Sequence, residues 1–201
     1  MAAQQGYDEA QYSLGAMYQY GEGVPKDIVK AVYWLEKAAK QGDAMAQSDL
    51  GALYLKGADI AQDYQKALYW CNLAAKQGEE LAQCNLGYMY HHGLGIPADR
   101  QRAIYFYSLA AEQGLARAKQ NLGYLYGQDG NYSVAIPLLL EAARQGQVRA
   151  QYNLGAAYLN GQGVAQDLAQ SLYWFEQAAR QGDSDAKEKV ALVQMLQNTN
   201  A

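Results

Sequence analysis

Few side chains in this 201-residue chain are of a type and spacing that could perform chemistry, and the most regular of them stand in glycine-rich loops. A Gly-x-Gly turn occurs at 21–23, 93–95 and 161–163. Such a turn can hold a phosphate when it follows a β-strand and opens a helix. No strand pattern precedes these turns, and they recur as parts of a repeat. We therefore interpret them as turns between helices and not as phosphate sites.

The histidines and cysteines form no recognisable ligand or nucleophile set. His91 and His92 are adjacent, so on a helix their side chains point about 100° apart and are poorly placed to bind one metal ion. Cys71 and Cys84 lie almost equally far from the turn at Gly78, which leaves open either a disulfide or two small buried apolar residues. No Ser/His/Asp or Cys/His arrangement stands outside the repeated positions. We therefore expect no metal, no cofactor and no enzyme activity.

The composition excludes two classes of partner. Half of the residues are hydrophobic, 18% are charged and the net charge is -4, without a run rich in lysine or arginine. Nucleic-acid binding is therefore not expected. No stretch approaches the roughly 18 apolar residues of a membrane span, and the given start has no signal-peptide pattern. The low cysteine count leaves the compartment open. Tyrosine is abundant, 18 against 2 Phe and 3 Trp, and it suits half-buried positions and binding surfaces.

The chain is a tandem repeat, because short motifs recur at an almost constant interval. The pair Gln-Gly appears six times at intervals of 36, 36, 36, 32 and 36 residues, beginning at Gln5-Gly6. A second motif, Leu-Gly-x-x-Tyr, appears five times with the same period. Its tyrosines are Tyr18, Tyr54, Tyr90, Tyr126 and Tyr158. We therefore predict five repeats, over residues 8–43, 44–79, 80–115, 116–147 and 148–183.

Each repeat is predicted to form two helices. Leu14 and Tyr18 are four residues apart and share a helix face, so the Leu-Gly-x-x-Tyr motif belongs to a buried first helix. Glycine in the middle of a helix costs about 1 kcal/mol relative to alanine. Because this glycine occurs in all five repeats, we expect another helix to cross there too closely for a side chain. The second helices combine one large residue such as Trp34 or Trp70 with small alanines, which favours close packing.

The linker between the two helices has its own signals. Glycine ends the first helix in the left-handed conformation, and in the first repeat Pro25 prevents its continuation. The second helices then begin after good N-cap residues, Asp27, Asp63, Asp99, Asn131 and Asp167. In the second repeat Asp59 stands in place of the second glycine, whose conformation Asp tolerates better than most residues. The fourth repeat is shorter because Gly127-Gln128-Asp129-Gly130 replaces the longer linker.

The combined pattern resembles the Sel1-like repeat family, which is related to the tetratricopeptide repeats. The resemblance rests on Ala-Gln-x-x-Leu-Gly-x-x-Tyr, then Gly-x-Gly-Val-x-x-Asp, then Lys-Ala-x-x-Trp-x-x-Lys-Ala-Ala-x-Gln-Gly, and it covers about residues 8–186. It implies an all-α fold, a right-handed α/α solenoid of five helix pairs. Residues 184–198 are predicted to form a C-terminal capping helix. We expect residues 1–201 to form a single solenoid domain that belongs to a longer array.

The resemblance also implies a function, that of a bacterial scaffold or adaptor that binds a protein or peptide partner on its concave face. An alternative is an inhibitor of the immunity type, which would block a toxic enzyme by docking on it. We expect a monomer. In the related family the first helices line the concave face. The positions there that escape the repeat pattern give the candidate contacts Tyr12, Tyr20, Lys56, Tyr88, His92, Gln120, Tyr124, Tyr152 and Asn160.

These candidate tyrosines have a second interpretation. Half-buried tyrosine is common, so they could fill gaps between successive first helices instead of contacting a partner. The sequence leaves both interpretations open.

Overall fold

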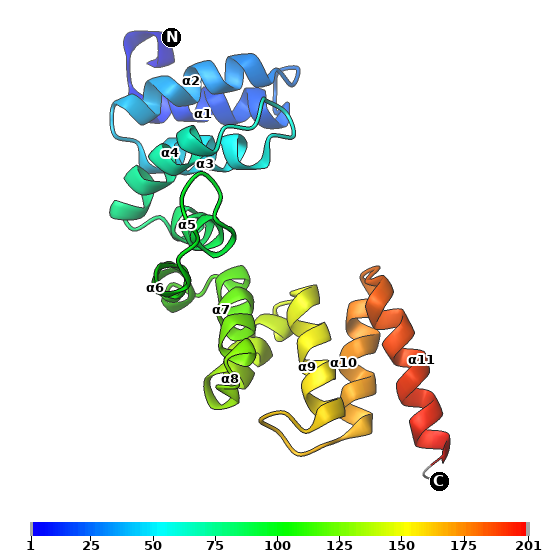
Figure 1. The fold of residues 1–201 in the computed structure, drawn as a ribbon. Coiled ribbons are helices and arrows are strands. Elements are labelled where there is room, and N and C mark those ends of the chain that lie inside the picture. Colours follow the sequence, from blue (N-terminus) through cyan, green and yellow to red (C-terminus); the bar gives the residue numbers. More distant parts are fainter. Residues whose placement is uncertain (1, 200–201) are drawn as a thin grey trace. The chain divides into compact units, whose positions relative to one another are not determined.

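The computed structural model describes residues 2–199, and over that range it contains only helices (Figure 1). A short 3-10 helix, η1, comes first, and eleven α-helices follow it. Their bounds are η1 (Ala2–Gln5), α1 (Asp8–Tyr20), α2 (Ile28–Lys40), α3 (Ala44–Lys56), α4 (Tyr64–Lys76), α5 (Glu80–His92), α6 (Arg100–Glu112), α7 (Ala116–Gln128), α8 (Tyr132–Arg144), α9 (Val148–Asn160), α10 (Leu168–Arg180) and α11 (Ser184–Thr199). The predicted all-α fold of tandem helix pairs is confirmed.

The helices group into two compact units, Met1–Ala110 and Ala111–Ala201. In the first unit α1 packs on α2 and α3 packs on α4, and the pairs are joined through contacts of α2 with α3 and of α4 with α5. In the second unit α7 packs on α8 and α9 packs on α10, while α8 contacts α9 and α10 contacts α11. Figure 1 shows α9, α10 and α11 side by side in this order.

The N-caps of the second helices follow the sequence prediction with one exception. Asp27, Asp99 and Asp167 each accept a hydrogen bond from a backbone N–H three residues later, at 3.0, 3.0 and 2.9 Å. Asp63 caps α4 in the same way. Asn131 stands at the N-cap position of α8 as predicted, but it makes no cap hydrogen bond, because its side-chain oxygen accepts from the hydroxyl of Ser133.

The prediction that Asp59 replaces a left-handed glycine is wrong. Every residue with positive φ in the described part of the chain is glycine. In the second repeat Gly57, with φ of 63°, ends α3. Asp59 does not have a positive φ. Its carboxylate forms an ion pair of 3.1 Å with Lys26, which lies in the linker of the first repeat. The linker of the second repeat therefore differs in backbone conformation from those of the first, third and fifth repeats, where Gly23, Gly95 and Gly163 have positive φ.

The glycines in the middle of the first helices mark close helix crossings, as the sequence predicts. A Cβ atom placed on Gly15 would lie 2.8 Å from Cγ of Leu35. On Gly87 the nearest atom would be Cδ1 of Tyr107 at 2.6 Å, and Tyr107 is fully buried. The same relation holds in the last repeat between Gly155 and the ring of Phe175. First and second helices of a repeat therefore touch at a point where a methyl group does not fit.

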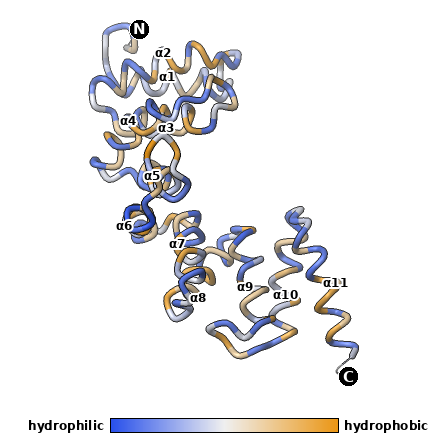
Figure 2. The backbone as a smooth tube through the Cα atoms, in the orientation of Figure 1, coloured by the Kyte–Doolittle hydropathy of each residue, from blue (hydrophilic) through white to orange (hydrophobic). Residues whose placement is uncertain are grey.

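The core runs between the helix pairs and is built from alanine, leucine and aromatic residues. Trp70 belongs to the core cluster of the first unit and Trp174 to one in the second. Figure 2 shows hydrophobic and hydrophilic segments alternating along the helices, as expected when each helix buries one face. Among residues 2–199 no helix is long and apolar enough to cross a membrane.

Pairs of glutamines, one buried on a first helix and one exposed at the end of a second helix, connect successive helix pairs, and they explain why the two glutamine motifs recur. Gln47 donates from Nε2 to the carbonyl of Ala39 at 3.0 Å, and its Oε1 accepts from Nε2 of Gln77 at 2.9 Å. Gln77 also donates to the carbonyl of Gly42. Gln151 and Gln181 make the equivalent bonds in the second unit. The pair of Gln47 and Gln77 thus joins the first helix α3 to the second helix before it, α2, and to the second helix after it, α4.

We expect Gln47→Leu to lower the free energy of unfolding by about 1–3 kcal/mol, because it leaves the buried carbonyl of Ala39 without its donor and removes the acceptor of the Gln77 amide. Urea unfolding followed by circular dichroism measures the loss. Gln101→Leu is the matched control, since Gln101 is exposed on α6, and it should change stability by less than about 0.5 kcal/mol. Equal effects of the two substitutions would contradict a role for the amide pair.

Candidate functional site

The first-helix face consists of the side chains that the first helix of each repeat carries two residues before, and two and six residues after, the repeat leucine. The structure divides the nine candidate residues on this face by exposure. Tyr20, Tyr88 and Tyr124 have exposed fractions of 63%, 42% and 43%. Lys56, His92 and Asn160 are also exposed. These six side chains are accessible to a partner.

The other three candidates are less accessible. Gln120 has an exposed fraction of only 9%, and its amide donates to Oδ1 of Asn121, so little of it is accessible to a partner. Tyr12 and Tyr152 are half-buried. The ring of Tyr152 packs edge-on against Phe175, with 5.3 Å between centroids. Half-burial of Tyr12 and Tyr152 fits the gap-filling interpretation.

The two histidines lie at the end of α5 next to Tyr88. The rings of His91 and His92 are stacked at 4.4 Å, and the ring of Tyr88 lies 4.3 Å from that of His92. Burial, together with the neighbouring His92, holds the pKa of His91 below its usual value. Within residues 2–199 no group of three or more His, Cys, Asp or Glu side chains could hold a metal ion. Cys71 and Cys84 are both buried and are not joined by a disulfide.

Asp49 is a site residue that the sequence analysis missed. It lies on α3, partly buried, and accepts a hydrogen bond from the hydroxyl of Tyr12 on α1. Burial raises the pKa of this carboxyl to about 6, and the carboxylates of Asp43 and Glu79 act in the same direction, whereas Tyr12 and Lys56 oppose the rise. Burial and Asp49 also raise the pKa of Tyr12 to about 12. A carboxylate in an unfavourable environment thus lies on α3 next to Tyr12 of the first-helix face.

A signal for Asp49 was present in the sequence. The residue before the repeat leucine is polar but uncharged in the other four repeats, where it is Ser13, Asn85, Asn121 and Asn153. A carboxylate at this one position departs from that pattern. Such a departure is informative, because the position lies close to the buried leucine and a charge there is poorly hydrated.

In the first unit, the tyrosine of each Leu-Gly-x-x-Tyr motif has a Lys or Arg side chain of the same protein over its ring. Lys66 lies 4.8 Å from the ring centroid of Tyr54 and forms an ion pair of 3.8 Å with the N-cap residue Asp63. The first repeat shows the same arrangement with Lys30 over Tyr18, and the third with Arg102 over Tyr90. Each of these tyrosines therefore has an intramolecular cation–π partner.

A second row of tyrosines was also missed, on the outer side of the second helices. Their exposed fractions are between 50% and 58%, and each ring packs edge-on against the following Trp or Phe at about 5 Å. The four residues are Tyr33, Tyr69, Tyr105 and Tyr173. Pro137 takes this place in the fourth repeat. Because these four tyrosines are about as exposed as Tyr20, Tyr88 and Tyr124, their substitution by alanine is a matched control for substitutions on the first-helix face.

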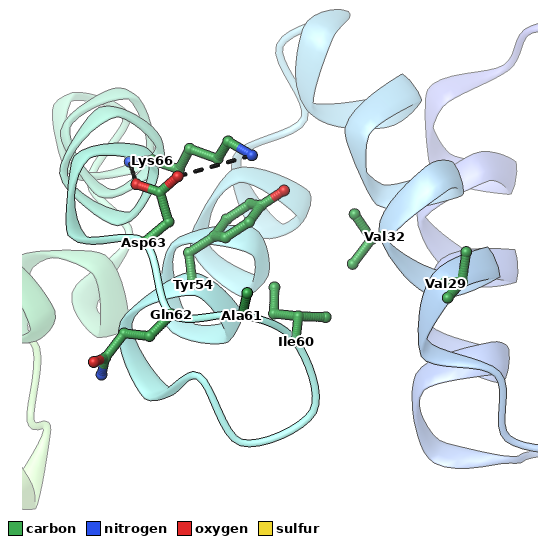
Figure 3. Close-up of a pocket in the computed structure, with 8 residues that line it drawn as sticks. All are labelled: Val29, Val32, Tyr54, Ile60, Ala61, Gln62, Asp63 and Lys66. Carbon is green, nitrogen blue, oxygen red and sulfur yellow. Dashed lines mark hydrogen bonds and ion pairs between the residues drawn. The ribbon is translucent and has the colours of Figure 1, made fainter.

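A shallow cavity of about 290 Å³ opens between α2 and the linker of the second repeat (Figure 3). Val29 and Val32 form one wall and Ile60 the other, while the ion pair of Asp63 and Lys66 stands at its edge. In the third repeat the linker glycine Gly95 lies so close to Tyr64 on the preceding second helix that a Cβ would be 2.7 Å from it. Asp59 holds the corresponding position in the second repeat, and its side chain prevents the same approach. The charged groups of the lining, Asp63 and Lys66, pair with each other, and Asp63 also caps α4.

Comparison with known proteins identifies the family. The family model described as the Sel1 repeat matches five consecutive segments, at residues 8–43, 44–79, 81–115, 116–147 and 148–183. The chain therefore belongs to the Sel1 repeat family, and proteins built from these repeats generally mediate protein–protein interactions. A search of curated proteins returned no match.

Solved structures with the same fold include two that are clearly related in sequence. One is c5321, a protective antigen of uropathogenic Escherichia coli, with 38% identity and a TM-score of 0.84; the alignment covers 96% of this chain and 42% of that protein. The chain thus spans less than half the length of c5321. The second is a Sel1 repeat protein from Oxalobacter formigenes, with 32% identity and a TM-score of 0.84, covering 92% of this chain and 76% of that one.

A third structure bears on the inhibitor alternative. The immunity protein Pa5087 from Pseudomonas aeruginosa has 21% identity and a TM-score of 0.57, and the alignment covers 89% of this chain and 70% of that protein. At this level of identity the likeness shows a shared fold and nothing about the partner. The inhibitor alternative stays a prediction.

Proposed function

We propose that the chain is a non-enzymatic scaffold or adaptor that binds a partner protein through the first-helix face of its repeats. The observation that supports this most directly is the exposure of Tyr20, Tyr88 and Tyr124 at positions that the repeat does not use for packing. Tyrosine provides a rigid contact area with a hydrogen-bonding tip at small entropic cost, and it is enriched where binding energy concentrates.

The arrangement of the remaining polar groups agrees with binding and not with catalysis. The N-cap aspartates accept hydrogen bonds from the helix backbone, and the paired glutamines bond to one another and to backbone carbonyls. His91 and His92 stack on each other at the helix end. Each compact unit offers its own part of the first-helix face, with Tyr20 and Tyr88 in the first unit and Tyr124 in the second.

The test begins with a pull-down from the source organism, in which mass spectrometry identifies the bound protein. Titration calorimetry then compares the chain with the double variant Tyr88→Ala and Tyr124→Ala. We expect the affinity to fall by about 2 kcal/mol or more, roughly 30-fold, because exposed aromatic anchors carry a large share of binding energy. The helical circular dichroism signal should persist.

The control is the double variant Tyr69→Ala and Tyr173→Ala on the second helices, with one substitution in each unit. These tyrosines are at least as exposed as Tyr88 and Tyr124, so the control removes similar surface from the other side of the repeats. An unchanged affinity in the first variant, together with a loss in the control, would place the binding surface on the second helices and contradict the proposal.

A further inference from the structure

The helix α11 has apolar side chains on two different sides. On one side Val190 and Val193 pack into a core cluster that contains Phe175 of α10. On another side Leu192 and Leu196 have exposed fractions of 41% and 37%. Figure 2 shows the second half of α11 as a largely hydrophobic segment. A helix that only covers the end of a solenoid has a polar outer side, so capping does not account for the two exposed leucines.

The exposed leucines of α11 continue the first-helix face. Val193 is fully buried, like Leu125 in α7, which follows its repeat leucine by three residues. The helix α11 therefore keeps the register of a first helix, with Val190 in the place of the repeat leucine. Leu192 and Leu196 follow Val190 by two and six residues, and these are the positions that define the first-helix face.

Packing between the helix pairs uses other positions of a first helix. The second helix of a repeat packs on the repeat glycine, as the ring of Phe175 does on Gly155. The residues of α7 that correspond to the two leucines are Tyr124 and Gln128, and both are exposed although α8 and α9 pack against α7. Packing of one helix pair on another therefore leaves these positions accessible.

The surface around the two leucines carries almost no charge. Residues 190–199 contain no Asp, Glu, Lys or Arg. Of all the first-helix-face positions on α7, α9 and α11, only Glu188 is charged. An uncharged apolar surface is complementary to an uncharged apolar occupant, because burying an unpaired charge against it costs free energy.

The two leucines are too small to hold a second molecule by themselves. A stable protein complex buries roughly 800 Å² on each partner, far more than two partly exposed side chains provide. A second copy of the chain held by α11 alone is therefore not expected. The leucines instead adjoin a larger surface, because Tyr152 and Ala156 of the first-helix face pack against the same core cluster as Val193.

We propose that α11 extends the first-helix face and that Leu192 and Leu196 bind the apolar side of an amphipathic helix of the partner protein. The inference rests on the proposed function, because it takes the first-helix face as the docking surface, and it adds the chemistry of the partner at one end of that face. Two leucines four residues apart form a ridge on α11, and the apolar stripe of another helix packs against such a ridge.

The probe is a pair of fluorescein-labelled helical peptides of equal length and equal net charge. One carries leucine at positions i, i+3, i+4 and i+7, and the other carries glutamine there. Fluorescence anisotropy at pH 7.5 measures their binding to the whole chain. We expect the leucine peptide to bind at least about tenfold more tightly, with less than about a twofold change between 50 and 200 mM salt, because apolar contacts are not screened. Equal binding of the two peptides would overturn the proposal.

Variants separate a site on α11 from general attraction between apolar surfaces. The double variant Leu192→Gln and Leu196→Gln should weaken the leucine peptide by about fivefold or more, while glutamine preserves the helix. The control is the double variant Val29→Gln and Val134→Gln on second helices, where the exposed fractions are 76% and 39%. It should leave binding unchanged. If the control weakens the peptide equally, the peptide binds any exposed apolar side chain and the proposal fails.

The natural partner distinguishes this inference from the proposed function. If its affinity falls with Tyr88→Ala and Tyr124→Ala but not with the α11 double variant, the first-helix face binds the partner and the extension onto α11 is wrong. If both double variants leave the affinity unchanged, both proposals are wrong. A loss in both, in protein that is still folded by circular dichroism, supports the extension.

Sedimentation of the whole chain tests the competing occupant, a second copy. We expect the original chain and the α11 double variant to sediment alike, as monomers. A dimer that becomes a monomer with Leu192→Gln and Leu196→Gln would assign α11 to self-association and overturn the proposal.

Discussion

Gly87→Leu in α5 is expected to lower the free energy of unfolding by about 3 kcal/mol, although leucine favours helices more than glycine does. Helix propensity alone would stabilise the variant by nearly 1 kcal/mol. Against this, the first added carbon would lie 2.6 Å from the fully buried ring of Tyr107. Overpacking of a tight core forces side chains out of their rotamers and shifts the backbone, which costs about 1–3 kcal/mol or more.

The measurement is the urea midpoint followed by circular dichroism, with a matched pair of smaller substitutions as control. Gly127→Ala in α7 adds the same methyl group where the nearest atom, the Cβ of Ala135, would be 3.9 Å away. Gly127→Ala should therefore stabilise by about 0.5 kcal/mol through helix propensity, whereas Gly87→Ala should destabilise. Stabilisation by both substitutions would show that α5 and α6 do not cross tightly at Gly87.

Asp49→Asn is expected to raise the stability at pH 7.5, by about 1–3 kcal/mol. The pKa of Asp49 rises from 3.8 to about 6 on folding. Between these values the folded state binds a proton that the unfolded state does not, so the cost of the ionised carboxylate is largest above pH 6 and disappears as the pH falls below about 4. Asparagine keeps the acceptor for the Tyr12 hydroxyl and carries no charge.

Urea unfolding at pH 4, 5, 6 and 7.5 tests this dependence. The advantage of Asp49→Asn over the original chain should shrink as the pH falls and should be close to zero at pH 4 and below. Glu22→Gln, a substitution in the exposed turn after α1, is the control and should change stability by less than about 0.5 kcal/mol at every pH. An advantage that is independent of pH would mean that the carboxyl of Asp49 is not the group responsible.

The sequence by itself determined the architecture of this protein. The recurring Gln-Gly and Leu-Gly-x-x-Tyr motifs predicted the helix pairs, and the mid-helix glycines predicted close crossings, as Gly87 and Tyr107 show. These features can be recognised in the sequence because each depends on neighbouring residues or recurs in every repeat. Residues at fixed spacing on a helix share a face, and a glycine repeated in every unit needs a structural reason.

Only the tertiary structure decided which side chains remain exposed and which charges meet. Gln120, at the position that the half-buried Tyr12 and Tyr152 hold in other repeats, is largely buried. Burial raises the pKa of Asp49, and the carboxylates of Asp43 and Glu79, next to the first helices α3 and α5, act in the same direction. Burial and Coulomb interactions depend on distances between residues tens of positions apart in the chain, and these distances follow from how the helices pack. A single repeat does not contain that information.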